Sequence, residues 1–265
     1  MHRAPILGLL SLAALSLTAT ASAQTVQVYS EFAHLSDSGE PLAPAEPREI
    51  LSPAVPRNAF STFQIAIQAP QGSKYNVFIG QNPDNAVKVT VYRKAGDKLE
   101  PVGLPYEADS SQVLWLDVWV DAAAPVRRVK VEPQVFIDGI WLSYPMEVRV
   151  NDAVIPAHAA APGVASAAVT NPGVSNPYDV TRAFLCGGKP RPIAGRVPIG
   201  EDLQFRNARQ DLALLAQTSD AQREEARRAL GGCTAPASAN PTPADPELYL
   251  RLRDLFFRPS WQKMR

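Results

Sequence analysis

Residues 113–120 (Val-Leu-Trp-Leu-Asp-Val-Trp-Val) form an apolar stretch between two polar, turn-rich flanks. Because successive side chains of a β-strand point to opposite faces, one face of this stretch is aliphatic: Leu114, Leu116, Val118 and Val120. The other face carries Trp115, Asp117 and Trp119, and we call it the Trp-Asp-Trp face. The pattern predicts a central strand with its aliphatic face in the core. What covers the Trp-Asp-Trp face is then the main question about function.

Similar alternation recurs at short intervals on both sides of this stretch. It predicts further strands at residues 25–30, 60–69, 75–80, 87–92, 126–137 and 140–150. Turn residues separate them, and Asp138-Gly139 is a strong hairpin signal. No helical pattern lies between the strands, which excludes an α/β fold with helical crossovers. The fold class expected is mainly β, an antiparallel Ig-like β-sandwich.

The segments around the predicted strands have different compositions. Prolines between Glu31 and Arg57 exclude a helix and a central strand, and predict an extended surface segment. We expect the sandwich to span residues 24–152 and an Ala/Pro-rich linker to span 153–178. Residues 179–265 are expected to be helical.

Three helices are predicted in the C-terminal region. One opens at Gly200-Glu201-Asp202, with Phe205, Ala208, Leu212 and Leu215 as its apolar stripe. The second is capped by Asp220 and ends at Gly231-Gly232. The third begins at Asp245-Pro246, and its stripe (Leu248, Leu252, Leu255 and Phe256) packs on the chain itself or on a partner.

The N-terminus has the features of a signal peptide. A short basic start precedes an apolar stretch at residues 6–17, which is short for a membrane span, and Ala21-Ser22-Ala23 fits a cleavage site. We expect residues 1–23 to be removed and the protein to be secreted or periplasmic. An uncleaved anchor is the alternative, and no later segment is apolar enough to cross a membrane.

Two cysteines, Cys186 and Cys233, lie in the last third of the chain. In an oxidising compartment such a pair is most simply a disulfide. Two free thiols or a metal site are the alternatives. A metal site is disfavoured because the mature chain keeps only His34 and His158, neither at ligand spacing from a cysteine. We expect no metal and no cofactor.

Formal charge and motifs exclude several classes of function. The 26 basic and 26 acidic residues give no net charge, which argues against nucleic acid as the main partner. Ser260-x-x-Lys263 and Gly187-Gly188-Lys189 lack the context of a penicillin-recognising site and of a phosphate loop. A carboxylate pair for glycoside hydrolysis would draw on Glu107, Asp109 or Asp117, but Glu107 and Asp109 read as solvated loop acids. No catalytic residue is assigned.

Short motifs resemble a known family. Residues 55–64 (Val-Pro-Arg-Asn-Ala-Phe-Ser-Thr-Phe-Gln), the strand at 114–120, the turn at 122–125 and the strand at 128–135 are similar to the β-sandwich domain at the N-terminus of secreted family-123-type glycoside-hydrolase-like proteins. The resemblance covers residues 50–150 and implies a sandwich fold. In that family the catalytic acid lies in a C-terminal barrel, for which too few residues follow here, so no catalytic residue is carried over.

The Trp-Asp-Trp face is the candidate binding site. Trp115 and Trp119 lie roughly 13 Å apart along one strand face. Exposed, they would form an aromatic platform for sugar rings or a protein, and Trp141 would extend it from a neighbouring strand. The alternative is that the proline-rich segment or the C-terminal helices cover this face.

These features favour a secreted, non-catalytic β-sandwich binding or assembly module of a bacterial-type cell envelope, with a protein or polysaccharide partner. The alternative is a small secreted carbohydrate-active enzyme or carbohydrate-binding protein that uses the Trp115 and Trp119 face. The sequence leaves the oligomeric state open.

Overall fold

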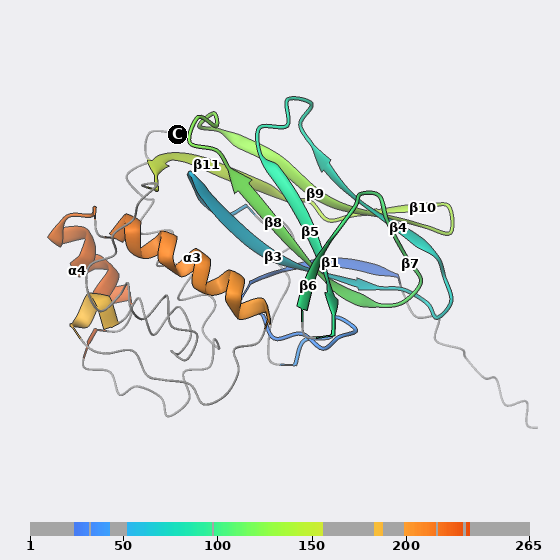
Figure 1. Cartoon of the computed structure of the whole chain (residues 1–265). Helices are drawn as coiled ribbons and strands as arrows, with labels where there is room; N and C mark the ends of the chain where they lie inside the picture. The colour runs from blue at the N-terminus through green and yellow to red at the C-terminus, as the bar shows by residue number, and fades with distance from the viewer. Residues whose placement is uncertain are drawn as a thin grey trace, which may run out of the picture.

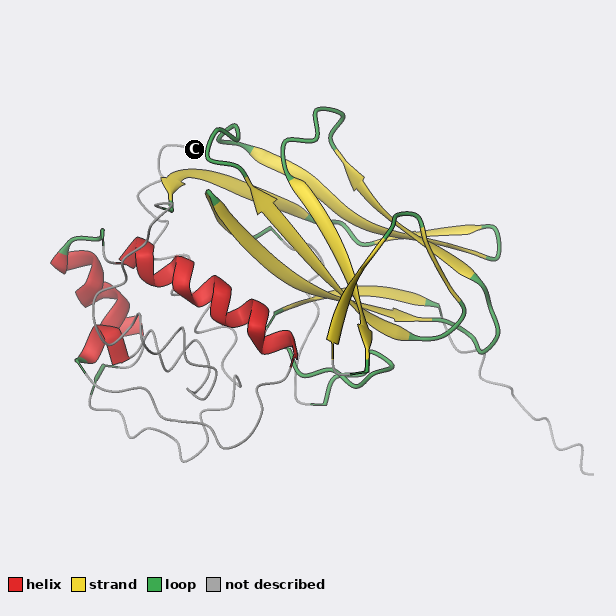
Figure 2. Ribbon diagram, in the orientation of Figure 1, coloured by secondary structure: helices red, strands yellow, loops and turns green. Residues whose placement is uncertain are grey.

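Two β-sheets packed face to face make up most of the protein in a computed structural model (Figures 1 and 2). The structure describes residues 24–31, 33–42, 52–96, 98–155, 183–187, 199–215, 217–229 and 232–233. The predicted signal peptide, most of the predicted linker and the predicted third helix lie outside the described residues.

Both sheets are formed mainly by antiparallel strands. The first sheet has the order β1 (Thr25–Ser30), β3 (Ala59–Gln68), β8 (Gln112–Val120), β5 (Lys88–Ala95) and β6 (Lys98–Val102). The second has the order β2 (Ala54–Arg57), β11 (Glu147–Val154), β9 (Arg128–Ile137), β4 (Tyr75–Gln81) and β7 (Tyr106–Ala108), with β10 (Ile140–Ser143) also paired to β9. The β2–β11 pair is parallel. The predicted mainly-β antiparallel sandwich is confirmed.

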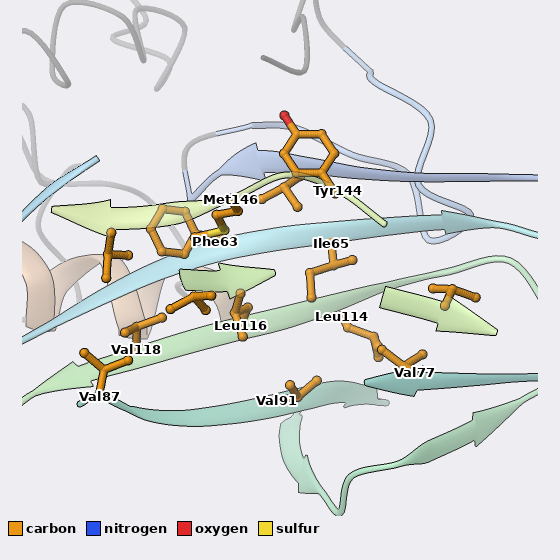
Figure 3. Close-up of a cluster of buried hydrophobic side chains, with 14 of the residues drawn as sticks. Phe63, Ile65, Val77, Val87, Val91, Leu114, Leu116, Val118, Tyr144 and Met146 are labelled. Carbon is orange, nitrogen blue, oxygen red and sulfur yellow. The ribbon is translucent and has the colours of Figure 1, made fainter. Parts of the chain in front are cut away.

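The aliphatic face of β8 lies in the core, as predicted. β8 is the middle strand of the first sheet, and its four aliphatic residues named above are all fully buried. They face Phe63 and Ile65 of their own sheet and residues such as Val77 of the second sheet (Figure 3). Burial of these branched side chains between the sheets provides the main driving force for the fold.

Three strands were not predicted, and one predicted strand is divided. β2, β6 and β7 are short, and β2 contains Pro56, which is tolerated because β2 lies at the edge of its sheet. The predicted strand 140–150 is split at Tyr144-Pro145 into β10 and β11. β10 completes a hairpin with β9 through Asp138 and Gly139, both at positive φ, as the hairpin signal predicted. β11 runs to Val154, two residues past the predicted end of the sandwich.

The chain crosses from the second sheet to the first at Asn58, which has a φ of 57°. The Nδ2 atom of Asn58 donates a hydrogen bond to the Ile155 carbonyl oxygen at 2.6 Å. Arg57 binds the Asp152 carbonyl oxygen at 2.9 Å, and its own carbonyl accepts from the Ile155 amide at 2.9 Å. These two residues therefore fasten the end of β11 to the crossover.

The C-terminal region is helical and disulfide-linked, as predicted. It contains α3 (Ile199–Leu215), α4 (Asp220–Ala229) and a short helical turn at residues 183–186. Cys186 and Cys233 form a disulfide across a separation of 47 residues. Among the described residues, no helix is long and apolar enough to span a bilayer.

The sequence predicts Asp220 as the N-cap of α4, but the N-cap is Ser219. The Gln222 amide donates to Ser219 Oγ at 3.3 Å, and Gln222 Oε1 accepts from the Ser219 amide at 2.9 Å. This reciprocal pair is a capping box, with Asp220 left as the first helical residue. Gly232, at a φ of 79°, donates its amide to the Arg227 carbonyl and ends the helix.

Candidate functional site

The Trp-Asp-Trp face lies on the outer side of the first sheet, in the middle of three strands. Thr62 of β3 and Thr90 of β5 lie directly opposite Asp117. Gln64 and Tyr92 flank Trp115 in the same way, while Phe60 and Lys88 flank Trp119. The register therefore places one carboxylate at the centre of a face that has an aromatic residue on each side of it.

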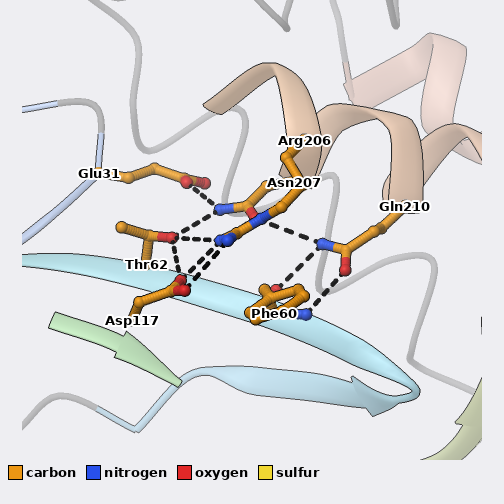
Figure 4. Close-up of polar contacts among 7 residues, drawn as sticks. All are labelled: Glu31, Phe60, Thr62, Asp117, Arg206, Asn207 and Gln210. Carbon is orange, nitrogen blue, oxygen red and sulfur yellow. Dashed lines mark hydrogen bonds and ion pairs between the residues drawn. The ribbon is translucent and has the colours of Figure 1, made fainter. Parts of the chain in front are cut away.

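α3 covers this carboxylate. Arg206 donates from Nη1 to Asp117 Oδ2 at 3.0 Å and from Nη2 to Oδ1 at 2.6 Å (Figure 4). The Asp117 side chain is 3% exposed and that of Arg206 30%. A bidentate arginine–carboxylate pair of this kind fixes both position and orientation. A C-terminal helix therefore covers the centre of the Trp-Asp-Trp face at Asp117.

Further polar side chains complete the contact between α3 and the sheet. Thr62 donates to Asp117 Oδ1 at 2.9 Å and accepts from Arg206 and Asn207, both at 3.1 Å. Asn207 also donates to a carboxylate oxygen of Glu31, which follows β1. Glu31, Thr62 and Asn207 are all fully buried. The helix thus docks through a buried polar network, whose members bond to one another in place of water.

Gln210 closes an open stretch of strand edge. β1 ends where Ser30 pairs with Phe63, so the edge of β3 before Phe63 has no strand partner on that side. Gln210 accepts from the Phe60 amide at 2.7 Å and donates to the Phe60 carbonyl oxygen at 3.2 Å. Its side-chain amide therefore takes the place of a neighbouring strand, which satisfies backbone groups that would otherwise be unpaired.

Aromatic contacts surround the same point. The Arg206 guanidinium lies 3.9 Å from the centroid of the Phe60 ring, a cation–π geometry. The Phe60 and Trp119 rings are 4.5 Å apart. Trp119 and Trp115 are both partly buried. Neither tryptophan therefore stands free as a wide, flat platform.

The N-terminal segment covers the other end of the face. Gln64 Nε2 donates to the carbonyl oxygens of Ser30 at 3.2 Å and Ala33 at 2.7 Å. Gly39, at a φ of 89°, lies so close to the sheet that a Cβ there would be 2.9 Å from the Cβ of Ala66. Only glycine allows this approach. The proline-rich N-terminal segment and a C-terminal helix, the two covers that the sequence suggested, therefore both lie on the Trp-Asp-Trp face.

Asp117 is shielded from any substrate. Both of its oxygens are bound by Arg206, and its side chain is only 3% exposed, so almost none of the carboxylate is open to a ligand. Burial raises the pKa of the Tyr92 phenol; the nearby charge of Asp117 raises it further and that of Arg206 lowers it. The carboxylate acts here as a buried anchor for an arginine.

The other candidate acids lie elsewhere. Glu107 is in β7 of the second sheet and Asp109 follows it, and both are exposed. The structure does not bring either of them to the Trp-Asp-Trp face, since Asp117 belongs to the first sheet. Within the described residues, no group of three or more His, Cys, Asp and Glu is placed to hold a metal ion.

Trp141 does not extend the face, so this part of the prediction is wrong. It lies in β10, which pairs with β9 of the second sheet, because the Asp138-Gly139 hairpin keeps it beside β9. Its ring instead contacts Phe78 of β4 at 5.1 Å and Phe136 of β9 at 5.0 Å. Among the described residues, the ring contacts of Trp119 and those of Trp141 therefore lie on different sheets.

Arg206, Asn207 and Gln210 were missed by the sequence analysis. They follow one another at spacings of one and three residues, which places polar groups on one side of α3. Leu212 and Leu215, two members of the predicted apolar stripe, are fully buried, as expected. The remaining motif residues, His158, Gly188-Lys189, Ser260 and Lys263, lie outside the described residues.

Comparison with known proteins gives only weak structural similarities. No protein-family model matches the sequence, and no curated protein is significantly similar to it. A solved family 123 glycoside hydrolase from Clostridium perfringens, studied for hydrolysis of glycolipid glycans, shares 12% identity at a TM-score of 0.36, covering 62% of this chain and 32% of that one. Domains 4 and 5 of the S-layer protein SbsC share 11% identity at a TM-score of 0.24, covering 53% and 81%.

The glycoside hydrolase is of the family that the strand motifs resemble. The chain spans about a third of the length of that enzyme. At these TM-scores the likeness assigns no role to any residue, so the site is interpreted from its own geometry.

Proposed function

We propose that this protein is an exported, non-catalytic β-sandwich module of the cell envelope that binds or assembles with a polysaccharide or protein. The observation that carries the proposal is the state of Asp117. This acid, at the centre of the Trp-Asp-Trp face, is buried and bound through both oxygens by Arg206. A group held in this way positions a helix and does not exchange protons with a substrate.

The disulfide supports export. A bond between Cys186 and Cys233 joins the only two cysteines of the chain. Structural disulfides persist in oxidising compartments such as the periplasm and the cell exterior, and are rare in the cytosol. This agrees with the signal-peptide pattern at residues 1–23.

The experiment combines a binding and a hydrolysis assay on the mature chain, residues 24–265. The protein is incubated with insoluble envelope material and with purified polysaccharides, and both co-sedimentation and released reducing ends are measured. We expect the protein to sediment with envelope material and to release no sugar. The variants Trp115→Ala and Trp119→Ala, assayed in parallel, report whether the first-sheet face takes part.

Two results would contradict the proposal. One is release of reducing ends that saturates with substrate and disappears in Glu107→Gln or Asp109→Asn, which would indicate a carbohydrate-active enzyme. The other is failure of the mature protein to be retained by any envelope fraction, whether polysaccharide or protein.

A further inference from the structure

Three aromatic rings form a cluster on the outer face of the second sheet. The strands that carry them, β4, β9 and β10, extend away from α3 (Figure 1). The rings belong to Phe78, Phe136 and Trp141, on three neighbouring strands. Trp141 lies directly opposite Phe136 in the β9–β10 hairpin, and Phe78 lies opposite Gln134 of β9. The Trp141 ring reaches across β9 to contact both phenylalanines.

The cluster is supported from below and open above. Phe78 and Phe136 are partly buried, while Trp141 is 54% exposed. The Trp141 ring is tilted by 51° to Phe78 and by 44° to Phe136. Contacts with two rings on the sheet limit how far the indole can turn, so a ring fixed in this way keeps its free surface towards solvent.

Polar side chains border the rings along β9. Gln134 Nε2 donates to Glu132 Oε2 at 3.1 Å, and its amide lies over Gly80, where a Cβ would come within 3.0 Å of it. Lys130 in turn forms an ion pair with Glu132. Ser143, exposed, lies opposite Gln134. The border therefore offers amide, hydroxyl and carboxylate groups, and its nearest charges on β9 neutralise each other.

The size of the cluster decides between partners. On β4, β9 and β10 the exposed large apolar side chains are Trp141 and Ile140 alone. A stable protein–protein interface takes about 800 Å² from each partner, whereas one aromatic side chain offers at most about 250 Å². A patch this small matches one or two sugar rings, whose C–H faces stack on an indole while their hydroxyls bond to polar groups at its edge.

We propose that Trp141, supported by Phe78 and Phe136 and bordered by Gln134, is the binding platform for a neutral polysaccharide built of pyranose rings. The proposal rests on the function proposed above and names its ligand and its site. It moves the binding surface from the Trp-Asp-Trp face, which α3 and the N-terminal segment cover, to the opposite sheet. Lys130 and Glu132 form an ion pair beside the rings, and the exposed Glu107 lies on the same outer face, in line with Phe136 through Asn76. A negative charge there disfavours an acidic glycan and favours a neutral one.

The chain offers a matched control in Ile140. It is 54% exposed, like Trp141, and precedes it in the same strand. Because neighbouring strand residues point to opposite faces, Ile140→Ala removes an equally exposed apolar side chain from the same hairpin without touching the aromatic cluster. Trp141→Phe is the conservative variant, since it keeps a smaller ring.

The test is native affinity electrophoresis of the mature chain in gels containing laminarin, hydroxyethyl cellulose, xylan or galactomannan. We expect at least one of these neutral polysaccharides to retard the wild type and Ile140→Ala equally. Trp141→Ala should weaken binding by on the order of tenfold or more, and Trp141→Phe by less. Trp115→Ala should be retarded like the wild type. Circular dichroism of each variant checks that the fold is retained.

Retardation of Trp141→Ala equal to that of the wild type would overturn the inference, as would absence of retardation by all four polysaccharides. Either result leaves the binding module intact if envelope material still retains the protein. Sugar release, by contrast, would contradict the non-catalytic function while the Trp141 platform could still be measured. The two failures are therefore distinguishable.

Discussion

The Asp117–Arg206 pair determines where α3 sits on the sandwich. Removing two charges from water is costly, and the attraction between them offsets that cost only when geometry and further hydrogen bonds are good. Here Thr62 adds a bond to each partner, and Asn207 a bond to Arg206. The pair therefore contributes mainly specificity, because its bidentate geometry requires the guanidinium at one position of the helix.

Arg206→Ala should destabilise the protein by about 3 kcal/mol, because it leaves the Asp117 carboxylate buried without its cation. The lower end of the usual range is expected, since Arg206 is 30% exposed and water can reach part of the vacated space. Urea unfolding measures the change. Arg93→Ala is the control: it breaks the exposed ion pair with Glu100, and we expect a much smaller cost because water screens that pair. Equal costs for the two variants would contradict this account.

The Tyr75 phenol should ionise at a higher pH than an ordinary tyrosine, because its pKa is raised. Its hydroxyl donates to the Ser110 carbonyl at 2.7 Å and accepts from Gln112 at 2.8 Å, and burial raises its pKa to about 12. The free side chain has a pKa of about 10. Because the folded pKa is the higher one, the neutral phenol's contribution to stability is complete below about pH 10 and is lost as pH rises through 12.

An ultraviolet titration of tyrosinate formation tests this directly. Tyr75→Phe should remove a step near pH 12 and leave earlier steps unchanged. Its free energy of unfolding should also fall less steeply than that of the wild type between about pH 10 and 12. If the variant instead loses a step near pH 10, Tyr75 is not shielded as described.

The sequence predicts the strand residues of this site but not the helix residues that bind them. Alternation along β8 is enough to place Trp115, Asp117 and Trp119 together, since the strand period is two. It could not identify Arg206, which is 89 residues away along the chain. Pairing between such distant residues depends on how two elements dock, and no local pattern encodes that.

At the level of elements, the length of a strand decides whether its pattern is detectable. β8 and β3, with 9 and 10 residues, were evident from alternation. β2 and β7, with 4 and 3 residues, are too short to show a period. They form because neighbours already in place offer a free edge: β2 pairs with β11, and β7 with β4. Their existence is a tertiary effect, which single-sequence patterns do not contain.

Reduction of the disulfide should loosen the C-terminal helices and leave the sandwich folded. The bond joins the helical turn at 183–186 to the end of α4, where Arg227 also donates to the Leu185 carbonyl at 2.6 Å. Closing a loop of this length stabilises by on the order of 3–4 kcal/mol in the chain-entropy model. Hydrogen exchange should therefore speed up in α4 by about a hundredfold or more after reduction.

The exchange rates of β8 in the same sample serve as the internal control. They should not change, because β8 is held by β3 and β5 and by the core between the sheets. Equal acceleration in α4 and β8 would mean that the helices and the sandwich unfold as one unit.

In the whole molecule, α3 joins the helical region to the sandwich through a set of polar contacts. Arg206, Asn207 and Gln210 all bind β3 or β8, while the end of β11 is fastened separately by Arg57 and Asn58. The C-terminal end of the sandwich is thus held by residues of the sandwich itself. The contacts of α3 are a second, separate attachment. We therefore expect the two attachments to persist when the chain between them is cut.

Limited proteolysis should therefore cut first between residues 156 and 176 without separating the two products. The composition of that segment, rich in Ala and Pro with little apolar periodicity, favours cleavage there. After the cut, the fragment that contains α3 should co-elute with the sandwich in size-exclusion chromatography, because the Asp117–Arg206 network and the Gln210 bonds to Phe60 bridge them.

In Arg206→Ala the fragments should part at a lower urea concentration than in the wild type, whereas Arg93→Ala should behave like the wild type. A nicked wild-type protein whose fragments separate at once would show that the network does not hold the helix, and a first cut between residues 60 and 150 would place the domain boundary elsewhere.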